Sequence, residues 1–234
     1  MLFAGCKPDV QTSSVFSFAH TQMFIDDINK LVASEVLHIN ASDPDFIKVC
    51  SFARTEAIFF EIHTPEIINE SIERIKLIRQ KNKLACIFVI ITYTKSFSSI
   101  NFYIAGADHC LKLPSDSQER QSFLMGTLED SHWKKPFHLY LDRTRLLVCS
   151  ANSKLEITYT EMTIIDALIH APEHVMSQDS IAKTLDPNIV FYDPRALEKT
   201  ISRLRTKIKK NFNLELILSV RAFGYRLRRG TVRG

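Results

Sequence analysis

Short apolar runs alternate with amphipathic stretches through the first half of the chain. The run at residues 86–91 is apolar at every position, which is typical of a strand in a parallel sheet covered on both faces. Between the runs, apolar residues recur at helical spacing, as at Phe24, Ile28 and Leu31. The expected strands are residues 15–18, 36–39, 57–60, 86–91 and 110–111. Strands that alternate with helices predict right-handed crossovers and a doubly wound α/β sheet.

The pattern changes at a short polar segment, residues 131–136. The elements expected beyond it are strands at 137–141 and 145–149, helices from 159, 177 and 193, and a hairpin over 216–227 with a tight turn at 221–224. We therefore predict an α/β domain over residues 1–130, a linker over 131–136 and an α+β domain over 137–234.

The helix expected over residues 193–210 has two contrasting faces. Asp193 and Pro194 form a good helix start, as N-cap and first-turn residue. Leu197, Ile201, Leu204 and Ile208 fall on one narrow stripe, which predicts a buried face. Cations and small hydrogen-bonding residues occupy the rest: Arg195, Lys199, Ser202, Arg203, Thr206, Lys209 and Lys210. Alone, this face fits a solvated helix equally well, but three helices followed by a basic hairpin are the parts of a winged helix.

Charge divides the chain in the same place. Residues 1–133 contain 12 Lys and Arg against 16 Asp and Glu, whereas residues 134–234 contain 18 against 10. The excess of cations in the second part suits a partner with a phosphate backbone.

Composition excludes several other classes of protein. Cys6, Cys50, Cys86, Cys110 and Cys149 are odd in number and form no CxxC pair, which argues against a disulfide framework and a zinc site. The histidines lack ligand spacing, and no nucleophile–base arrangement indicates an enzyme, so we expect no metal, no cofactor and no catalytic residue. Without a long apolar run or a basic segment before one, we expect no signal peptide and no membrane span, hence a cytoplasmic protein.

The second part of the chain resembles the effector domain of OmpR/PhoB-family response regulators, a winged helix-turn-helix. The resemblance rests on the segments ITYTEMTIIDAL, EHVMSQDSIAKTL, PRALEKTISRLRTKI and ILSVRAFGYRL, in the family's order and spacing. It differs at Ala222, where a glycine is usual in the wing, and in residues 186–193, where the family contacts RNA polymerase.

The resemblance implies binding to double-stranded DNA and regulation of transcription. The helix beginning at Pro194 would enter the major groove, where Arg203 and Lys199 can read guanine edges. Arg221 would reach into the minor groove, helped by Ser219 and Tyr225. Tyr225 fits a core position of the wing equally well. Other expected contacts, to bases or phosphates, come from Arg195, Ser202, Arg205, Thr206, Lys209, Lys210, Arg226, Arg228 and Arg229.

The first part resembles, more weakly, the flavodoxin-like receiver domain that precedes this effector, through EAIFFEIHTP, CIFVIITYT and GADHCLKLP. A receiver uses an acidic pair for Mg²⁺, an aspartate nucleophile, a hydroxyl, a lysine and an aromatic switch residue. The residues of this chain at those positions are Ala19 and His20, Glu61, Thr92, Leu113 and Cys110. Of these only Thr92 keeps the required chemistry, so we expect a pseudo-receiver that is not phosphorylated, with Glu61 either mimicking the charged state or simply ending a strand.

A receiver-like domain that cannot be phosphorylated can still act as a dimerisation domain. The face at residues 98–128, with Phe102, Ile104, Phe123 and Leu124, predicts a constitutive homodimer on paired half-sites, with RNA polymerase as a further partner. Two alternatives stay open: a phosphorylated regulator with unusual site residues, and a first domain that senses a small molecule or a protein.

Overall fold

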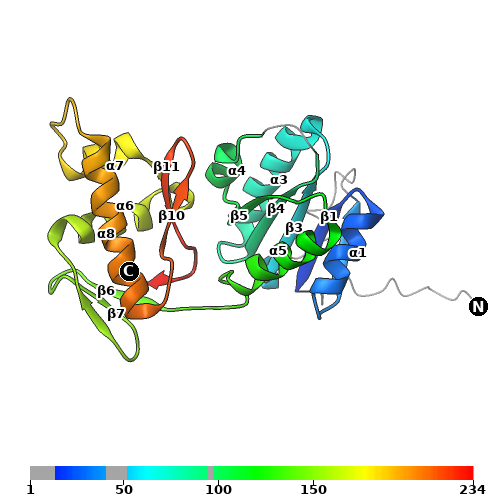
Figure 1. The fold of residues 1–234 in the computed structure, drawn as a ribbon, viewed down its shortest axis with the longest axis horizontal. Helices are drawn as coiled ribbons and strands as arrows, with labels where there is room; N and C mark the ends of the chain where they lie inside the picture. The colour runs from blue at the N-terminus through cyan, green and yellow to red at the C-terminus, as the bar shows by residue number, and fades with distance from the viewer. Residues whose placement is uncertain (1–13, 41–51, 94–96, 234) are drawn as a thin grey trace, which may run out of the picture. The chain divides into compact units, whose positions relative to one another are not determined.

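The computed structural model describes residues 14–40, 52–93 and 97–233, which form two compact units. The first consists of residues up to 95 with 109–129, and the second of residues 96–108 with 130–234 (Figure 1). Segment 96–108, which holds α4 (Ile100–Ala105), therefore groups with the second unit. Cys6 and Cys50 lie outside the described residues. None of the helices in the described ranges is long and apolar enough to cross a membrane.

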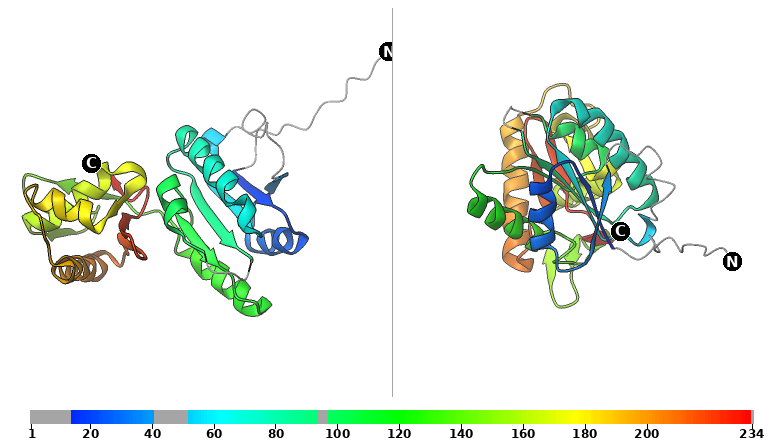
Figure 2. Two further views of the ribbon diagram at one scale, coloured as in Figure 1. Left: turned by 90° about the horizontal axis from the view of Figure 1, so that it is seen from above. Right: turned by 90° about the vertical axis from the view of Figure 1, so that its right-hand side faces the viewer.

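The first unit is built on a parallel five-stranded sheet of order β2-β1-β3-β4-β5. Its strands are β1 (Val15–Ala19), β2 (Val36–Asn40), β3 (Ala57–Ile62), β4 (Cys86–Ile91) and β5 (His109–Lys112). All residues of β3 and β4 are buried, because helices cover both faces of the sheet (Figure 2). The predicted doubly wound α/β fold is confirmed.

The helices of this sheet lie on opposite faces. Those of the first unit are α1 (Gln22–Leu31), α3 (Ile68–Lys81) and α5 (Ser117–Glu129), with short 3-10 turns η1 (Phe52–Arg54) and η2 (Pro65–Ile67). Helices α1 and α5 pack together through a buried ion pair, in which Arg120 Nε lies 2.8 Å from Asp27 Oδ2. The strand order reverses between β1 and β3, so the carboxyl ends of these strands form the crevice where ligands bind in such folds.

The second unit contains three helices and two small sheets, one antiparallel and one mixed because its strands β12 and β6 pair in parallel. A sheet of order β12-β6-β7-β8 consists of β6 (Leu139–Asp142), β7 (Leu147–Cys149), β8 (Lys154–Glu156) and β12 (Val232–Arg233). A second sheet of order β10-β11-β9 consists of β9 (Val175–Ser177), β10 (Ile217–Val220) and β11 (Gly224–Leu227). The helices are α6 (Tyr159–His170), α7 (Gln178–Leu185) and α8 (Pro194–Phe212), with η3 (Pro172–His174) after α6. This is the predicted winged helix-turn-helix.

Local capping explains where these helices begin. Thr158 and Glu161 form a capping box at α6: Thr158 Oγ1 accepts from the Glu161 N–H, and Glu161 Oε2 accepts from the Thr158 N–H. Ser177 caps α7 and Asp193 caps α8. In the second unit, β6 and β7 start at 139 and 147, two residues later than predicted. For β7 the reason is the preceding turn, in which Leu146 has φ 53°.

Glycine is required where the wing meets β9. A Cβ built on Gly224 would lie 2.2 Å from the backbone oxygen of Met176 and 2.8 Å from the backbone N of Gln178. No side chain of a neighbour can move to relieve such a contact, because both atoms belong to the backbone. The close approach lets β11 pair with β9 as well as with β10.

Candidate nucleic-acid interface and receiver-like crevice

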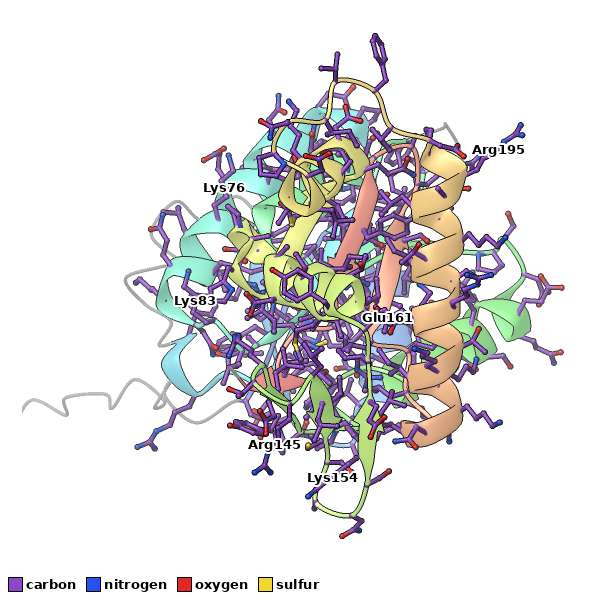
Figure 3. The ribbon with its side chains drawn as sticks, turned by 90° about the vertical axis from the view of Figure 1, so that its left-hand side faces the viewer. Lys76, Lys83, Arg145, Lys154, Glu161 and Arg195 are labelled. Carbon is purple, nitrogen blue, oxygen red and sulfur yellow. The ribbon has the colours of Figure 1, made fainter. Side chains whose placement is uncertain are left out.

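Helix α8 separates buried and exposed residues as its sequence pattern predicts. Leu197, Ile201, Leu204 and Ile208 are at most 6% exposed and join the core of the unit. The exposed side chains of the other face are Arg195, Lys199, Ser202, Arg203, Thr206, Lys209 and Lys210. Figure 3 shows Arg195 projecting from the first turn of α8, at the end of the helix that would enter a groove first.

Two interactions restrict what this face can donate. Thr206 Oγ1 donates to the Ser202 carbonyl at 3.0 Å, so the hydroxyl of Thr206 is left to accept hydrogen bonds rather than give them. Lys209 Nζ lies 2.9 Å from Glu215 Oε1, and this hydrogen bond raises the pKa of Lys209. The first interaction favours base donors over phosphates as partners of Thr206, and the second engages the Lys209 ammonium within the protein.

Lys207 on α8 is tied to the capping box of α6. Its Nζ lies 2.7 Å from Glu161 Oε2, and Figure 3 shows Glu161 beside the helix. Burial raises the pKa of Glu161, but the hydrogen bonds from Lys207 and Thr158 outweigh it and lower the pKa. Thr158 and Glu161 are recognisable in the sequence as a capping box. Nothing in the sequence indicates that Glu161 also pairs with Lys207, 46 residues further on.

A groove of about 370 Å³ separates α8 from β10. Its lining residues are Ser202, Arg205, Thr206, Lys209, Glu215, Ile217, Leu218 and Ser219. Within it, Arg205 Nε donates to the Ile217 carbonyl at 2.7 Å and Nη2 donates to Ser219 Oγ at 3.0 Å. The Arg205 guanidinium carbon is also 5.3 Å from the centroid of the Tyr225 ring, and burial lowers its pKa.

The structure corrects two expected DNA contacts on β11. Tyr225 and Arg226 are 5% and 8% exposed, because β11 is the central strand of its sheet. Tyr225 belongs to the core, as the alternative interpretation held. Arg226 lies against Tyr103 of the same unit, with its guanidinium carbon 4.7 Å from the ring centroid.

The remaining basic residues of the wing differ in exposure. Arg221 and Ser219 are exposed, and Ala222 in the turn has φ 58°, the left-handed conformation for which glycine is usual. Arg228 is half-buried and donates to the Lys135 carbonyl at 3.0 Å. Arg229 is 5% exposed and pairs with Asp108 and Glu173, so it is not available to a phosphate.

In the first unit, the carboxylate of Glu61 closes the crevice between β1 and β3. Its Oε2 accepts from the backbone N–H groups of His20 (2.6 Å) and Thr21 (2.8 Å), and its Oε1 accepts from the Thr21 hydroxyl (2.6 Å). Thr92 Oγ1 lies 3.5 Å from Oε1. Glu61 is 1% exposed, and the adjoining cavity measures about 10 Å³.

Of the other predicted receiver positions, His20 and Thr92 lie beside the Glu61 carboxylate, through the His20 N–H and the Thr92 hydroxyl. Ala19 ends β1, Cys110 is half-buried on β5 and Leu113 follows that strand. Lys112 is exposed, as expected for the other face. Among these receiver positions of the described residues, Thr92 is the one whose side-chain hydroxyl lies beside the Glu61 carboxylate.

Two histidines that the sequence did not connect meet at this crevice. The rings of His20 and His63 have centroids 4.2 Å apart. Burial, and next the neighbouring His63, lower the pKa of His20. At neutral pH this lowered pKa favours the uncharged form of the His20 imidazole.

Two of the four expected dimerisation residues are buried and two are exposed. Phe102 and Leu124 are each 1% exposed, because they pack into the core beneath α4 and α5, so they cannot contact a second copy. Ile104 and Phe123 are 46% and 43% exposed. The prediction of these four as one surface is therefore wrong for Phe102 and Leu124.

Comparison with known proteins identifies the second unit. Residues 152–227 match the family model described as "Transcriptional regulatory protein, C terminal". The transcriptional regulatory protein PhoP of Escherichia coli K12 is 27% identical over 161 residues, 64% of this chain and 71% of PhoP. The transcriptional regulatory protein AfsQ1 of Streptomyces coelicolor is 25% identical over 196 residues, 80% of this chain and 84% of AfsQ1. Among solved structures, the C-terminal domain of the nisin resistance regulator NsrR is 29% identical with a TM-score of 0.34, covering 41% of this chain and 93% of that one.

The winged helix and its family match define a transcriptional regulatory protein. The match covers residues 152–227 of the second unit, and over a longer stretch the chain is similar to the transcriptional regulatory proteins PhoP and AfsQ1.

Proposed function

We propose that this DNA-binding transcription regulator recognises specific sequences without aspartyl phosphorylation. The observation that carries the proposal is the buried Glu61 carboxylate at the phospho-acceptor position, with both oxygens already accepting hydrogen bonds. A carboxylate must present a free oxygen to a phosphoryl donor and Mg²⁺ to react. The adjoining space of about 10 Å³ is at the lower limit for one water molecule and too small for a phosphoryl group.

DNA binding would use the exposed face of α8. Arg203 and Lys199 would read guanine in the major groove, with Ser202 and Thr206 beside them. Arg195, Lys209, Lys210, Ser219, Arg221 and Arg228 remain proposed contacts to phosphates or to the minor groove. Of these, Lys209 is engaged by Glu215 and Arg228 by the Lys135 carbonyl, so we expect the exposed Arg195, Lys210 and Arg221 to contribute more.

The proposed regulator acts as a constitutive homodimer on half-sites about one helical turn apart. Exposed apolar side chains on α5 support this: Phe123 and Met125 are 43% and 50% exposed. Residues 186–193 would contact RNA polymerase, and Val190 and Phe191 in that loop are 83% and 92% exposed.

Incubation with acetyl phosphate and Mg²⁺ tests the central proposal. We expect an unchanged mass of this protein and an unchanged affinity for a duplex selected by it from a random pool. A mass gain of one phosphoryl group, with tighter binding, would support the alternative of a phosphorylated regulator. Sedimentation at micromolar concentration tests the dimer, and a monomer there would contradict it.

The second alternative, a sensing first domain, makes a different prediction. His20 and His63 would then form part of a ligand-responsive crevice, and a small molecule should change DNA affinity without changing mass. The 10 Å³ cavity beside Glu61 speaks against a ligand there in this conformation.

A further inference from the structure

Arg205 occupies a position on α8 where a cation would ordinarily be assigned to a DNA phosphate. Its side chain does not extend from the helix, however, but crosses the groove to β10. Two hydrogen bonds fix it there, one from Nε to the Ile217 carbonyl and one from Nη2 to Ser219 Oγ. Tyr225, 5% exposed, lies below the guanidinium plane.

We propose that Arg205 is a positioning residue that sets the spacing between the recognition helix and the wing and orients the Ser219 hydroxyl. This inference rests on the proposed DNA-binding function and adds to it a role for a side chain that would touch no nucleotide. Arginine suits this geometry, since its planar guanidinium offers divergent N–H donors at fixed angles, whereas a lysine ammonium does not.

The hydrogen bond to Ser219 has a directional consequence. A serine oxygen that accepts from a guanidinium keeps its own O–H as a donor, and it must point this hydrogen away from Arg205. Ser219 is exposed, so the hydrogen faces solvent in the free protein. When DNA binds, this donor is available to a phosphate oxygen between α8 and the wing.

Spacing is the second contribution. The Ile217 carbonyl belongs to β10, whose partner strand β11 continues from the turn with Arg221. By holding β10 against α8, Arg205 fixes how far Arg221 lies from the major-groove residues Lys199 and Arg203. If the distance between two contact regions fluctuates in the free protein, binding must fix it. The conformational entropy lost in this ordering lowers the affinity.

Arg205→Lys separates this role from the two others that an arginine here could have. The variant keeps the positive charge, so a phosphate contact would survive with little loss. A structural role alone would lower the melting temperature and leave the affinity of the folded protein unchanged. Positioning predicts a folded protein whose Kd rises about tenfold on a 30-bp duplex selected by the wild type, with the wild-type slope of log Kd against log salt.

Ser219→Ala completes the test as a double-mutant cycle. In the wild-type background we expect Kd to rise a few-fold, and in the Arg205→Lys background we expect no further rise, because the hydroxyl has already lost its orientation. Additive effects of the two substitutions would overturn the proposal. So would unchanged affinity of folded Arg205→Lys.

Two controls calibrate the measurement. Arg145→Lys makes the same substitution at an arginine whose side chain is 75% exposed and lies 3.9 Å from the Asp142 carboxylate, and it should bind as the wild type does. Lys210→Gln removes a proposed phosphate contact and should flatten the salt dependence by about one unit of slope. If the wild type enriches no duplex from the random pool, the proposed function itself fails. If it does and Arg205→Lys binds equally well, only the positioning role fails.

Discussion

The crevice around Glu61 and the exposed face of α8 both gather polar side chains, but the two regions use them in opposite ways. At the crevice, one carboxylate accepts from two backbone N–H groups and a hydroxyl of the β1–α1 loop, all within the first unit. Along α8, Arg195, Lys199 and Arg203 extend into solvent.

This difference separates a site that has become structural from one that stays open to a partner. A polar group that is already hydrogen-bonded within the protein can bind a ligand only if that bond is first broken. Leaving a buried polar group without a partner costs about 1–3 kcal/mol of folding free energy. Exposed cations carry no such cost and gain counterion release when a polyanion binds. Substitutions in each region should therefore have different readouts, stability in the first and DNA affinity in the second.

Gly224→Ala should have the largest effect, because it disrupts the packing of the wing in the DNA-binding unit. The new Cβ would meet backbone atoms of Met176 and Gln178 at 2.2 and 2.8 Å, so we expect at least about 3 kcal/mol of destabilisation and loss of DNA binding. Urea unfolding and gel-shift measurements check this. The matched control is Gly126→Ala on α5, where a Cβ meets nothing within 4 Å; it should stabilise the protein by about 0.5–1 kcal/mol.

Glu61→Ala tests the closed crevice. The N–H groups of His20 and Thr21 would lose their partner, so we expect about 2–3 kcal/mol of destabilisation in urea unfolding. DNA affinity of the folded protein should remain that of the wild type. Glu73→Ala, which breaks an exposed pair with Lys76, should change stability by less than about 1 kcal/mol. A loss of DNA affinity in Glu61→Ala would show that the carboxylate acts as a charge mimic.

Arg203→Ala tests the open face. Loss of a guanine contact should weaken binding to the selected duplex by about 1–3 kcal/mol and relax preference at one base position, measured by competition between duplexes. Lys210→Ala should instead weaken all sequences alike. Equal losses on selected and random duplexes in Arg203→Ala would contradict its role in base readout.

Glu161→Gln should have a smaller effect that depends on pH. The pKa of Glu161 is lowered below its usual 4.5, so its ion pair with Lys207 stabilises the fold above that value and is lost as pH falls through the folded-state pKa. Glutamine keeps the capping hydrogen bond, so we expect about 1 kcal/mol of destabilisation at pH 7, which shrinks as pH falls below 4.5 through the folded-state pKa of Glu161. A difference that stays constant throughout acid titration would rule out the ionic contribution.

Ala222→Gly should give the smallest change, and it should be a gain. Ala222 has φ 58° in the wing turn, where a Cβ is strained, so glycine should stabilise the second unit by up to about 1 kcal/mol in thermal unfolding. A lower melting temperature would mean that the stiffness of the alanine outweighs its strain.

Elements with strong local signals were predictable from sequence. The start of α8 follows from Asp193 and Pro194, and its buried stripe follows from apolar residues at helical spacing. The apolar run at 86–91 likewise gave β4 as the structure has it. In each case the signal lies within a few residues of the feature.

Features that depend on distant partners were not predictable in this way. β9 is three residues long, and its pairing makes β11 a central strand, which buries Tyr225 and Arg226. Arg205 reaches β10 across 12 residues, and no periodicity distinguishes it from the exposed Arg203. The same limit hid the pairing of His20 with His63, which are far apart in sequence and adjacent only at the sheet edge.

The carboxylate that closes the crevice has a consequence for the lifetime of any active state. A phosphoryl group on a receiver is removed by hydrolysis, so the signal decays while the polypeptide survives. Under the proposed function, DNA binding requires no phosphoryl group, so the binding-competent state lasts as long as the chain itself. Synthesis and degradation would then be the processes that set promoter occupancy, and a pulse-chase measurement of protein half-life would predict how quickly transcription returns to its resting level.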